Sequence, residues 1–300
     1  MAAKPYHFHV LDVFTSRRYA GNPLAVVLGA DDLDEGAMQR IAAEFNLSET
    51  IFVMAPENTD HEARVRIFTP RYEMPFAGHP TIGCAIHLAE RHWSKGRIDE
   101  TLVLEEGAGP VPVRVTRADG AIRATFTAPV IPRPAGTEPD RAAIARALRL
   151  APEDLADDHP VAAHEGGPRF LYVPLRDVEA LGRAEPLGPG WSDAVPKDAH
   201  SLYCYAPSPD DAVDYQARMF APDAGIMEDP ATGSASAILA SQLLGAGALP
   251  EGTTGLSLRQ GVEMGRPSEI GLEIDVAGEA IAAVRVSGSA VRVSDGQIFA

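Results

Sequence analysis

The sequence is poor in cysteine and in basic residues, and it has no long hydrophobic run. Its only cysteines, Cys84 and Cys204, cannot form a disulfide framework or a four-thiolate zinc site, and such usage is typical of a reducing compartment. Lysine and arginine total 26 against 42 acidic residues, and the net charge of −16 argues against a nucleic-acid partner. Apolar stretches such as 24–28 and 237–240 are far shorter than the roughly 20 residues that span a bilayer, so no membrane partner is expected.

Signals for secretion, nucleotide binding and metal binding are also missing. Residues 1–10 are polar and lack the apolar segment of a secretory signal, which predicts a cytoplasmic protein. No Gly-x-Gly-x-x-Gly follows an expected strand, and residues 225–233 lack the lysine of a phosphate loop. His7 and His9 share one face of an expected strand, but no further ligands with zinc spacing accompany them. Packing or surface roles are therefore expected for both histidines, and no metal is predicted.

What the chain does contain is enough apolar material for two packed domains. Its length of 300 residues exceeds what one core usually organises, and 45% of the residues are hydrophobic. The densest cluster of prolines and glycines, within 128–140, indicates a crossing between domains. We expect an N-terminal domain of residues 1–128, completed by a C-terminal strand at 288–300, and a second domain of residues 129–287.

Helices and short strands alternate along both halves. Met38, Ile41, Ala42 and Phe45 have helical spacing, and Asp34 or Asp32 is a suitable N-cap. A second helix is expected over 141–150. Strands are expected at 6–14, 24–28, 51–54, 64–68, 101–104, 111–116, 121–127, 170–173, 201–205, 255–259, 271–276 and 281–286.

A degenerate internal repeat relates the two halves. Ala55-Pro56, Arg66-Ile67-Phe68-Thr69-Pro70 and His79-Pro80-Thr81-Ile82-Gly83-Cys84-Ala85 recur about 150 residues later as Ala206-Pro207, Arg218-Met219-Phe220-Ala221-Pro222 and Asp229-Pro230-Ala231-Thr232-Gly233-Ser234-Ala235. Three matches in the same order indicate two domains of similar build. The third match overlaps the starts of two segments, 81–89 and 231–244, that are helical in pattern and almost free of charge. A helix without a polar face is buried, so each segment is expected to be the central helix of a wrapped sheet.

The two turns before these helices are the candidate chemical sites. Pro80 and Pro230 are expected at first helical positions, where backbone N–H groups and the helix dipole favour an anion. If the domains face each other, both helix ends can hold one small carboxylate in an interdomain cleft. The simpler interpretation of Asp229 is that it only caps its helix. His79 in the equivalent turn is a poor cap but a good proton-transfer group, which favours a site.

Several segments resemble the phenazine-biosynthesis PhzF-like isomerases, and together they extend over the whole chain. They are Asp12-Val13-Phe14, Gly21-Asn22-Pro23, Asn46-Leu47-Ser48-Glu49-Thr50, Ile67-Phe68-Thr69-Pro70, Pro75-Phe76-Ala77-Gly78-His79-Pro80 and Glu228-Asp229-Pro230-Ala231-Thr232-Gly233-Ser234-Ala235. The resemblance implies an α+β, diaminopimelate-epimerase-like fold with two pseudo-symmetric domains, each a curled, mostly antiparallel sheet wrapped around a central helix. It also implies a homodimer and proton-shift chemistry without a cofactor.

The resemblance also assigns roles to residues. Glu49 stands where the family has its acid/base glutamate, and without the resemblance it would be interpreted as a solvated residue at the start of a strand. His79 and Asp229 are implied to contact the amino or hydroxyl group of the substrate and to help relay the proton. Ser234 and the N–H groups of Gly78 and Gly233 are implied to bind its carboxylate.

Two-base amino-acid racemases of this fold place a cysteine in each turn, and this chain has none there. Cys84 lies on the expected helix and Cys204 in an expected strand, so both are interpreted as small core residues. The sequence thus predicts a cofactor-independent isomerase or epimerase acting on a small amino- or hydroxy-carboxylate. A lyase or dehydratase of the same superfamily, a non-catalytic carboxylate-binding protein and a scaffolding protein remain alternatives.

Overall fold

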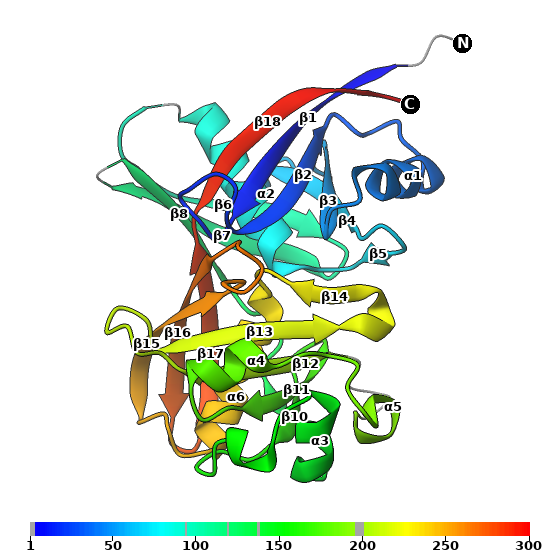
Figure 1. Ribbon diagram of the computed structural model, residues 1–300. Helices are drawn as coiled ribbons and strands as arrows, with labels where there is room; N and C mark the ends of the chain where they lie inside the picture. The colour runs from blue at the N-terminus through cyan, green and yellow to red at the C-terminus, as the bar shows by residue number, and fades with distance from the viewer. Residues whose placement is uncertain (1–3, 94, 119, 137–138, 196–200) are drawn as a thin grey trace. The chain divides into compact units, whose positions relative to one another are not determined.

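The computed structural model describes residues 4–93, 95–118, 120–136, 139–195 and 201–300. The chain divides into two compact units (Figure 1). The first contains Met1–Thr127 and Ser287–Ala300, and the second contains Ala128–Val286.

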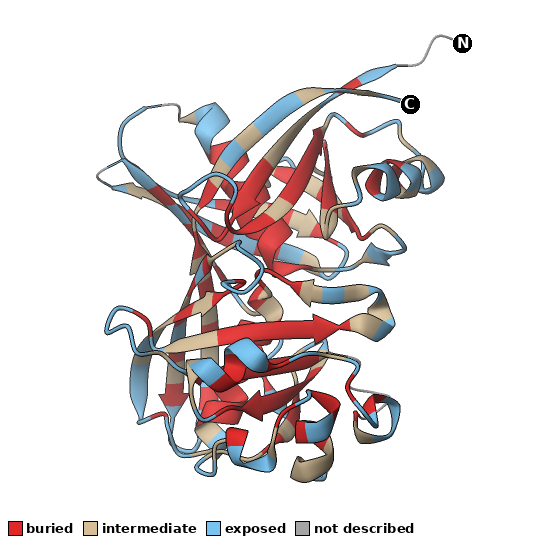
Figure 2. Ribbon diagram, in the orientation of Figure 1, coloured by how far each residue is buried: buried red, intermediate tan, exposed pale blue. Residues whose placement is uncertain are grey.

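The first unit is a sheet around helix α2 (Gly78–His92). Its strands are β1 (Pro5–Val13), β2 (Asn22–Leu28), β3 (Glu49–Met54), β4 (Ala63–Phe68), β5 (Glu73–Met74), β6 (Ile98–Glu106), β7 (Gly109–Ala118), β8 (Ala121–Thr127) and β18 (Ala290–Phe299), and α1 (Glu35–Phe45) lies outside it. Strand β1 pairs antiparallel with both β18 and β2, so the C-terminal segment completes this sheet. Residues 78–89 of α2 are all buried, as Figure 2 shows.

The second unit has the same plan around helix α6 (Gly233–Gly245). Its strands are β9 (Arg133–Pro134), β10 (Ala162–Glu165), β11 (Arg169–Pro174), β12 (Leu202–Pro207), β13 (Tyr215–Ala221), β14 (Ile226–Asp229), β15 (Gly252–Gln260), β16 (Ser268–Ala277) and β17 (Ala280–Gly288), and its smaller helices are α3 (Arg141–Ala147), α4 (Val178–Arg183) and α5 (Trp191–Ala194). Short 3-10 turns occupy Pro152–Asp154 and Pro222–Ala224.

Strand pairing reproduces the repeat that the sequence predicts. In the first unit β2 pairs parallel with β3, β3 antiparallel with β4, β4 parallel with β6, and β6 antiparallel with β7. In the second unit β11, β12, β13, β15 and β16 follow the same series of parallel and antiparallel pairings. The predicted α+β class with two pseudo-symmetric halves is confirmed.

Local sequence explains where the helices form. Asp34 caps α1 by accepting a hydrogen bond from the Ala37 N–H, and Met38, Ile41 and Ala42 are buried, as the spacing predicts. In α2 a Cβ atom at Gly83 would lie 2.6 Å from a methyl group of Leu24. Glycine therefore lets the helix approach β2 closely.

The predicted starts of the two central helices are wrong by two or three residues. Helix α2 begins at Gly78, so Pro80 is its third residue, and a proline is tolerated there because the first N–H groups have no partner within the helix. Helix α6 begins at Gly233, whereas Asp229 still belongs to β14. Pro230, Ala231 and Thr232 form the turn between them.

The two cysteines are core residues, as predicted. Both are free thiols and fully buried, Cys84 in α2 and Cys204 in β12. Burial raises the pKa of Cys204 to about 12 and that of Cys84 further. Neither thiol has the low pKa of a reactive cysteine.

Candidate active site

Glu49 and His79 form a close pair in the first unit. Glu49 is the first residue of β3, and His79 is the second residue of α2. His79 Nδ1 lies 3.1 Å from Glu49 Oε2, and the side chains are only 5% and 14% exposed. The structure thus brings together two of the residues to which the resemblance gives proton-transfer roles.

The imidazole of His79 is neutral. Burial lowers its pKa to about 3, and a hydrogen bond with the Pro23 backbone opposes this only in part. Its Nε2 atom is buried without a hydrogen-bond partner in the described part of the chain. Nδ1 is therefore the donor to Pro23, and Nε2 carries the lone pair. A buried acceptor of this kind is suited to an N–H or O–H group of a ligand.

The hairpin between β1 and β2 places the Pro23 carbonyl beside His79. Gly21 has a φ of 67°, and a Cβ atom there would lie 2.3 Å from the Val13 carbonyl oxygen, so only glycine fits. Asp12 accepts a hydrogen bond from the Tyr19 N–H across this turn, at 2.6 Å. The Gly21-Asn22-Pro23 segment therefore positions the histidine, a role that sequence reasoning missed.

No side chain caps the N-terminus of α2. Its N-cap residue, Ala77, offers no side-chain cap, and the first helical residue, Gly78, is buried. The Thr81 N–H donates to the Ala77 carbonyl, whereas the N–H groups of Gly78 and His79 have no acceptor within the helix. These N–H groups and the helix dipole provide a partial positive charge beside the Glu49–His79 pair.

Asp229 belongs to a hydrogen-bonded network in the second unit. The Thr232 hydroxyl donates to its carboxylate at 2.5 Å. Gln260, fully buried at the end of β15, donates to the Asp229 carbonyl at 2.7 Å and accepts from the Thr232 N–H at 3.1 Å. Sequence reasoning missed Gln260, because no local pattern links the end of a strand to a turn earlier in the chain.

Thr232, rather than Asp229, is the N-cap residue of α6, and its side chain makes no cap hydrogen bond. The first helical residues are Gly233 and Ser234, whose N–H groups have no acceptor within the helix. The turn therefore presents backbone donors beside a buried carboxylate, and the interpretation of Asp229 as the helix cap is not supported.

In each unit an arginine forms hydrogen bonds with a glutamate of the short strand that precedes the turn. Arg218 forms two hydrogen bonds of 2.8 Å with Glu228, the neighbour of Asp229, and also donates to the Ala184 carbonyl. In the first unit Arg66 pairs in the same bidentate way with Glu73. The two arginines are the first residues of the second repeated motif, and each lies over a phenylalanine ring.

No cluster of three or more His, Cys, Asp or Glu side chains that could hold a metal ion occurs in the part of the chain that the structure describes. His7 is exposed. The half-buried His9 packs against His87, with 4.3 Å between the two ring centroids.

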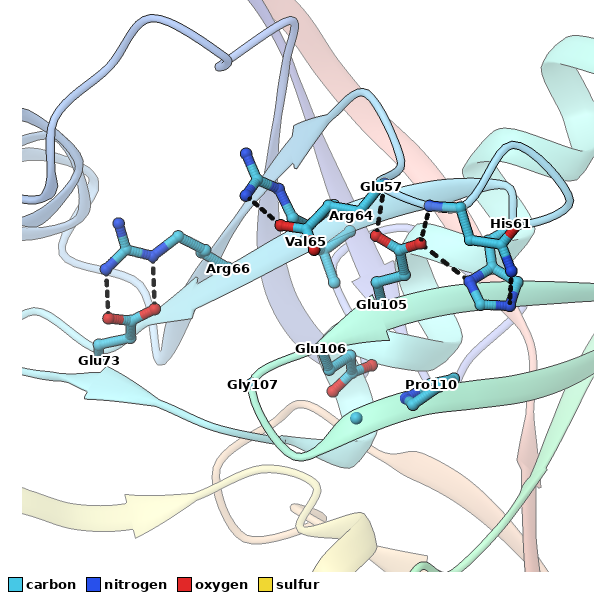
Figure 3. Close-up of a pocket in the computed structure, with 12 residues that line it drawn as sticks. Glu57, His61, Arg64, Val65, Arg66, Glu73, Glu105, Glu106, Gly107 and Pro110 are labelled. Atoms are coloured by element: carbon cyan, nitrogen blue, oxygen red, sulfur yellow. Dashed lines mark hydrogen bonds and ion pairs between the residues drawn. The ribbon is translucent and has the colours of Figure 1, made fainter.

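Among the described residues no helix is both long and apolar enough to cross a membrane. A pocket of about 620 Å³ lies beside β4 and the turn between β6 and β7 (Figure 3), and neither Glu49 nor His79 lines it.

Comparisons with known proteins agree over nearly the whole chain. Residues 11–296 match the family model described as phenazine biosynthesis-like protein. An uncharacterised isomerase of Mesorhizobium japonicum is 44% identical over 98% of both chains. A trans-2,3-dihydro-3-hydroxyanthranilate isomerase of Pseudomonas aeruginosa is 37% identical over 98% of this chain and 99% of its own. The crystal structure of a PhzF-family phenazine biosynthesis protein of Bacillus anthracis superposes with a TM-score of 0.88 at 26% identity, over 98% of this chain and 99% of that one.

Proposed function

Because the chain belongs to the phenazine biosynthesis-like family, whose named relatives are isomerases, we propose that it is a cofactor-independent isomerase that shifts a proton on a small amino- or hydroxy-carboxylate. The substrate named for the Pseudomonas relative, trans-2,3-dihydro-3-hydroxyanthranilate, is the first candidate. The observation that carries the proposal is the contact between Glu49 and the neutral His79 at a helix N-terminus that no side chain caps.

In the proposed reaction Glu49 removes a proton from one carbon of the substrate and delivers a proton to another carbon on the same face. The electron pair of the broken C–H bond moves through the adjoining double bond to the carbon that receives the proton, so no oxidant or reductant is needed. Negative charge develops on the carboxylate side of the substrate, where the N–H groups of Gly78 and His79 favour it.

His79 orients the substrate in this scheme. Its Nε2 lone pair accepts a hydrogen bond from the amino or hydroxyl group of the ligand. Because its pKa is about 3, the ring stays neutral through the physiological range and does not compete with Glu49 for the proton. The proposal gives Asp229 and the first N–H groups of α6, those of Gly233 and Ser234, a second set of contacts with the same substrate.

The proposal is tested by incubating the protein in D2O with trans-2,3-dihydro-3-hydroxyanthranilate and with a panel of amino and hydroxy acids. We expect deuterium to enter one carbon of the substrate or product, as detected by NMR, and we expect prior dialysis against EDTA to leave the rate unchanged. The Ser234→Ala and Asp229→Asn variants should be slower.

Two outcomes would contradict the proposal. A ligand that raises the melting temperature but never acquires carbon-bound deuterium would identify a carboxylate-binding protein without catalysis. Release of water with formation of a dehydrated product would identify a lyase instead.

A further inference from the structure

Glu106 is a buried carboxyl group that the proposed reaction does not use. It is the last residue of β6, is 7% exposed, and lines the pocket in Figure 3 beside the turn at Gly107. Its Oε1 atom lies 2.7 Å from the Thr81 hydroxyl oxygen, and its Oε2 atom has no hydrogen-bond partner in the described part of the chain. Thr81 itself is fully buried in the first turn of α2.

Counting protons shows which form of Glu106 fits this geometry. The Thr81 hydroxyl oxygen lies 2.8 Å from the Ala77 carbonyl oxygen as well as 2.7 Å from Glu106. A hydroxyl carries one proton, and a carbonyl and a carboxylate are both acceptors, so an ionised Glu106 leaves one contact without a hydrogen. A protonated Glu106 donates to Thr81, and Thr81 donates to Ala77, so both contacts are satisfied.

The electrostatic surroundings also favour the neutral acid. Burial raises the pKa of Glu106 to about 8, and the hydrogen bond with Thr81 opposes the shift only in part. The basic side chains of the pocket contact other carboxylates: Arg64 contacts Glu57, Arg66 contacts Glu73, and His61 contacts Glu105. On α2 burial raises the pKa of the Cys84 thiol, and a charge on Glu106 raises it further.

The second unit contains the neutral counterpart of this arrangement. Strand β15 occupies the place of β6 in the repeated topology, and it ends in Gln260, which binds Thr232 at the start of α6. A glycine follows in both units, and a Cβ atom at Gly107 or Gly261 would lie 3.0 Å from Pro75 Cα or Pro230 Cα. The second unit thus has the side-chain amide of Gln260 at this place, whereas the first unit has the carboxyl group of Glu106, whose proton serves as the donor.

We propose that Glu106 is a positioning residue, held as a neutral carboxylic acid, that fixes the first turn of α2 through Thr81 and the Ala77 carbonyl. Ala77 directly precedes Gly78 and His79, so Glu106 controls the anion-binding N–H groups and the imidazole. The Ala108 N–H, in the turn after Glu106, donates to the Pro75 carbonyl. This hydrogen bond is a second link between the β6–β7 turn and the segment that precedes α2. The catalytic part of this inference rests on the proposed function, whereas the structural part does not.

The direct test is an NMR titration of the ligand-free protein with labelled glutamate side chains and backbone amides. We expect the Glu106 carboxyl signal to titrate with a midpoint near pH 8, and the amide signals of Gly78 and His79 to move with the same midpoint. In Glu106→Gln, which keeps a donor but cannot ionise, both amide signals should stay constant from pH 6 to 9. In Thr81→Val the carboxyl should still titrate, but the amides should no longer follow.

A Glu106 carboxyl that is already ionised at pH 6 would overturn the proposal, and so would amide shifts that persist unchanged in Glu106→Gln. The wild-type titration decides the question even if a variant fails to fold. Once a substrate is known, kcat of the wild type should fall about tenfold per pH unit above pH 8 with little change in KM. Glu106→Gln should lack this fall. Absence of any proton exchange would refute the proposed function but leave the titration result standing.

Discussion

The turns before the two central helices occupy equivalent places in the repeated topology, but they differ in how their polar groups are hydrogen-bonded. In the first unit the His79 ring lies next to Glu49, and its Nε2 atom is a buried acceptor without a hydrogen-bond partner among the described residues. In the second unit the Asp229 carboxylate accepts a hydrogen bond from the Thr232 hydroxyl, and the Gln260 side chain donates a hydrogen bond to the Asp229 carbonyl. Under the proposed function, the first turn receives and moves a proton, whereas the hydrogen bonds of the second turn hold the Asp229 carboxylate in one position.

The largest expected difference between the units is the loss of stability when the arginine–glutamate ion pair of each unit is broken. Arg218 and Glu228 are 9% and 15% exposed, so Arg218→Met leaves a buried carboxylate without its partner and should cost about 3 to 5 kcal/mol. Arg66 and Glu73 are 28% and 34% exposed, and Arg66→Met should cost about 1 kcal/mol. Urea denaturation of the whole protein measures both. Equal losses would show that the second turn is no more firmly held than the first.

Acid should destabilise the protein through His79. Because its pKa is lowered from 6.5 to about 3 in the fold, its contribution to stability is complete above pH 6.5 and is lost as the pH falls toward 3. Wild type should therefore lose ~1.4 kcal/mol per pH unit relative to His79→Gln in that window. Denaturation at pH 4, 5 and 7 checks this, and a ring that NMR shows to protonate near pH 6.5 would refute it.

A rise in pH should destabilise the protein through Glu106, in the direction opposite to the effect of acid on His79. Its pKa is raised from 4.5 to about 8, so the stability that the neutral acid provides is complete below pH 4.5 and is lost as the pH rises to 8. Relative to Glu106→Gln, wild type should lose ~1.4 kcal/mol per pH unit across this window. Gln260→Ala, which alters the uncharged counterpart in the second unit, should change stability by an amount that does not depend on Glu106 ionisation. A constant difference between Glu106→Gln and wild type from pH 5 to 8 would contradict the account.

The smallest effect is expected from thiol chemistry. Both cysteines are fully buried, and burial raises their pKa values. Iodoacetamide should leave the native protein unlabelled by mass spectrometry and its exchange activity intact. Complete inactivation at one label per chain would mean that a thiol takes part in the reaction.

Patterns that lie within one segment were sufficient to predict much of this fold. The spacing of Met38, Ile41 and Ala42 with the Asp34 cap predicts α1, and the uncharged 231–244 run predicts the buried α6, which begins two residues after the start of that run. The repeat predicts that both units share one order of strands. These signals succeed because periodicity, capping and burial depend on neighbours in the sequence.

The contacts that complete each turn could not be predicted, because they join distant segments. Pro23 reaches His79 only through the β1–β2 hairpin, and Gln260 reaches Thr232 only because β15 lies beside β13. Glu106 looks like any acidic residue at the end of a strand, and only burial against Thr81 distinguishes it. The residues of the repeated motifs could be selected from the sequence, whereas their partners required the fold.

If Glu49 carries the proton, replacing its carboxylate should slow the entry of solvent deuterium into substrate carbon. The Glu49→Gln variant keeps the size of the side chain and one acceptor oxygen but cannot take up a proton from carbon. Glu44→Gln, on the exposed face of α1, is the matched control. We predict that Glu49→Gln exchanges about 10²- to 10⁴-fold more slowly while ligand affinity is kept, and that Glu44→Gln matches wild type. Equal exchange rates in Glu49→Gln and wild type would contradict the account.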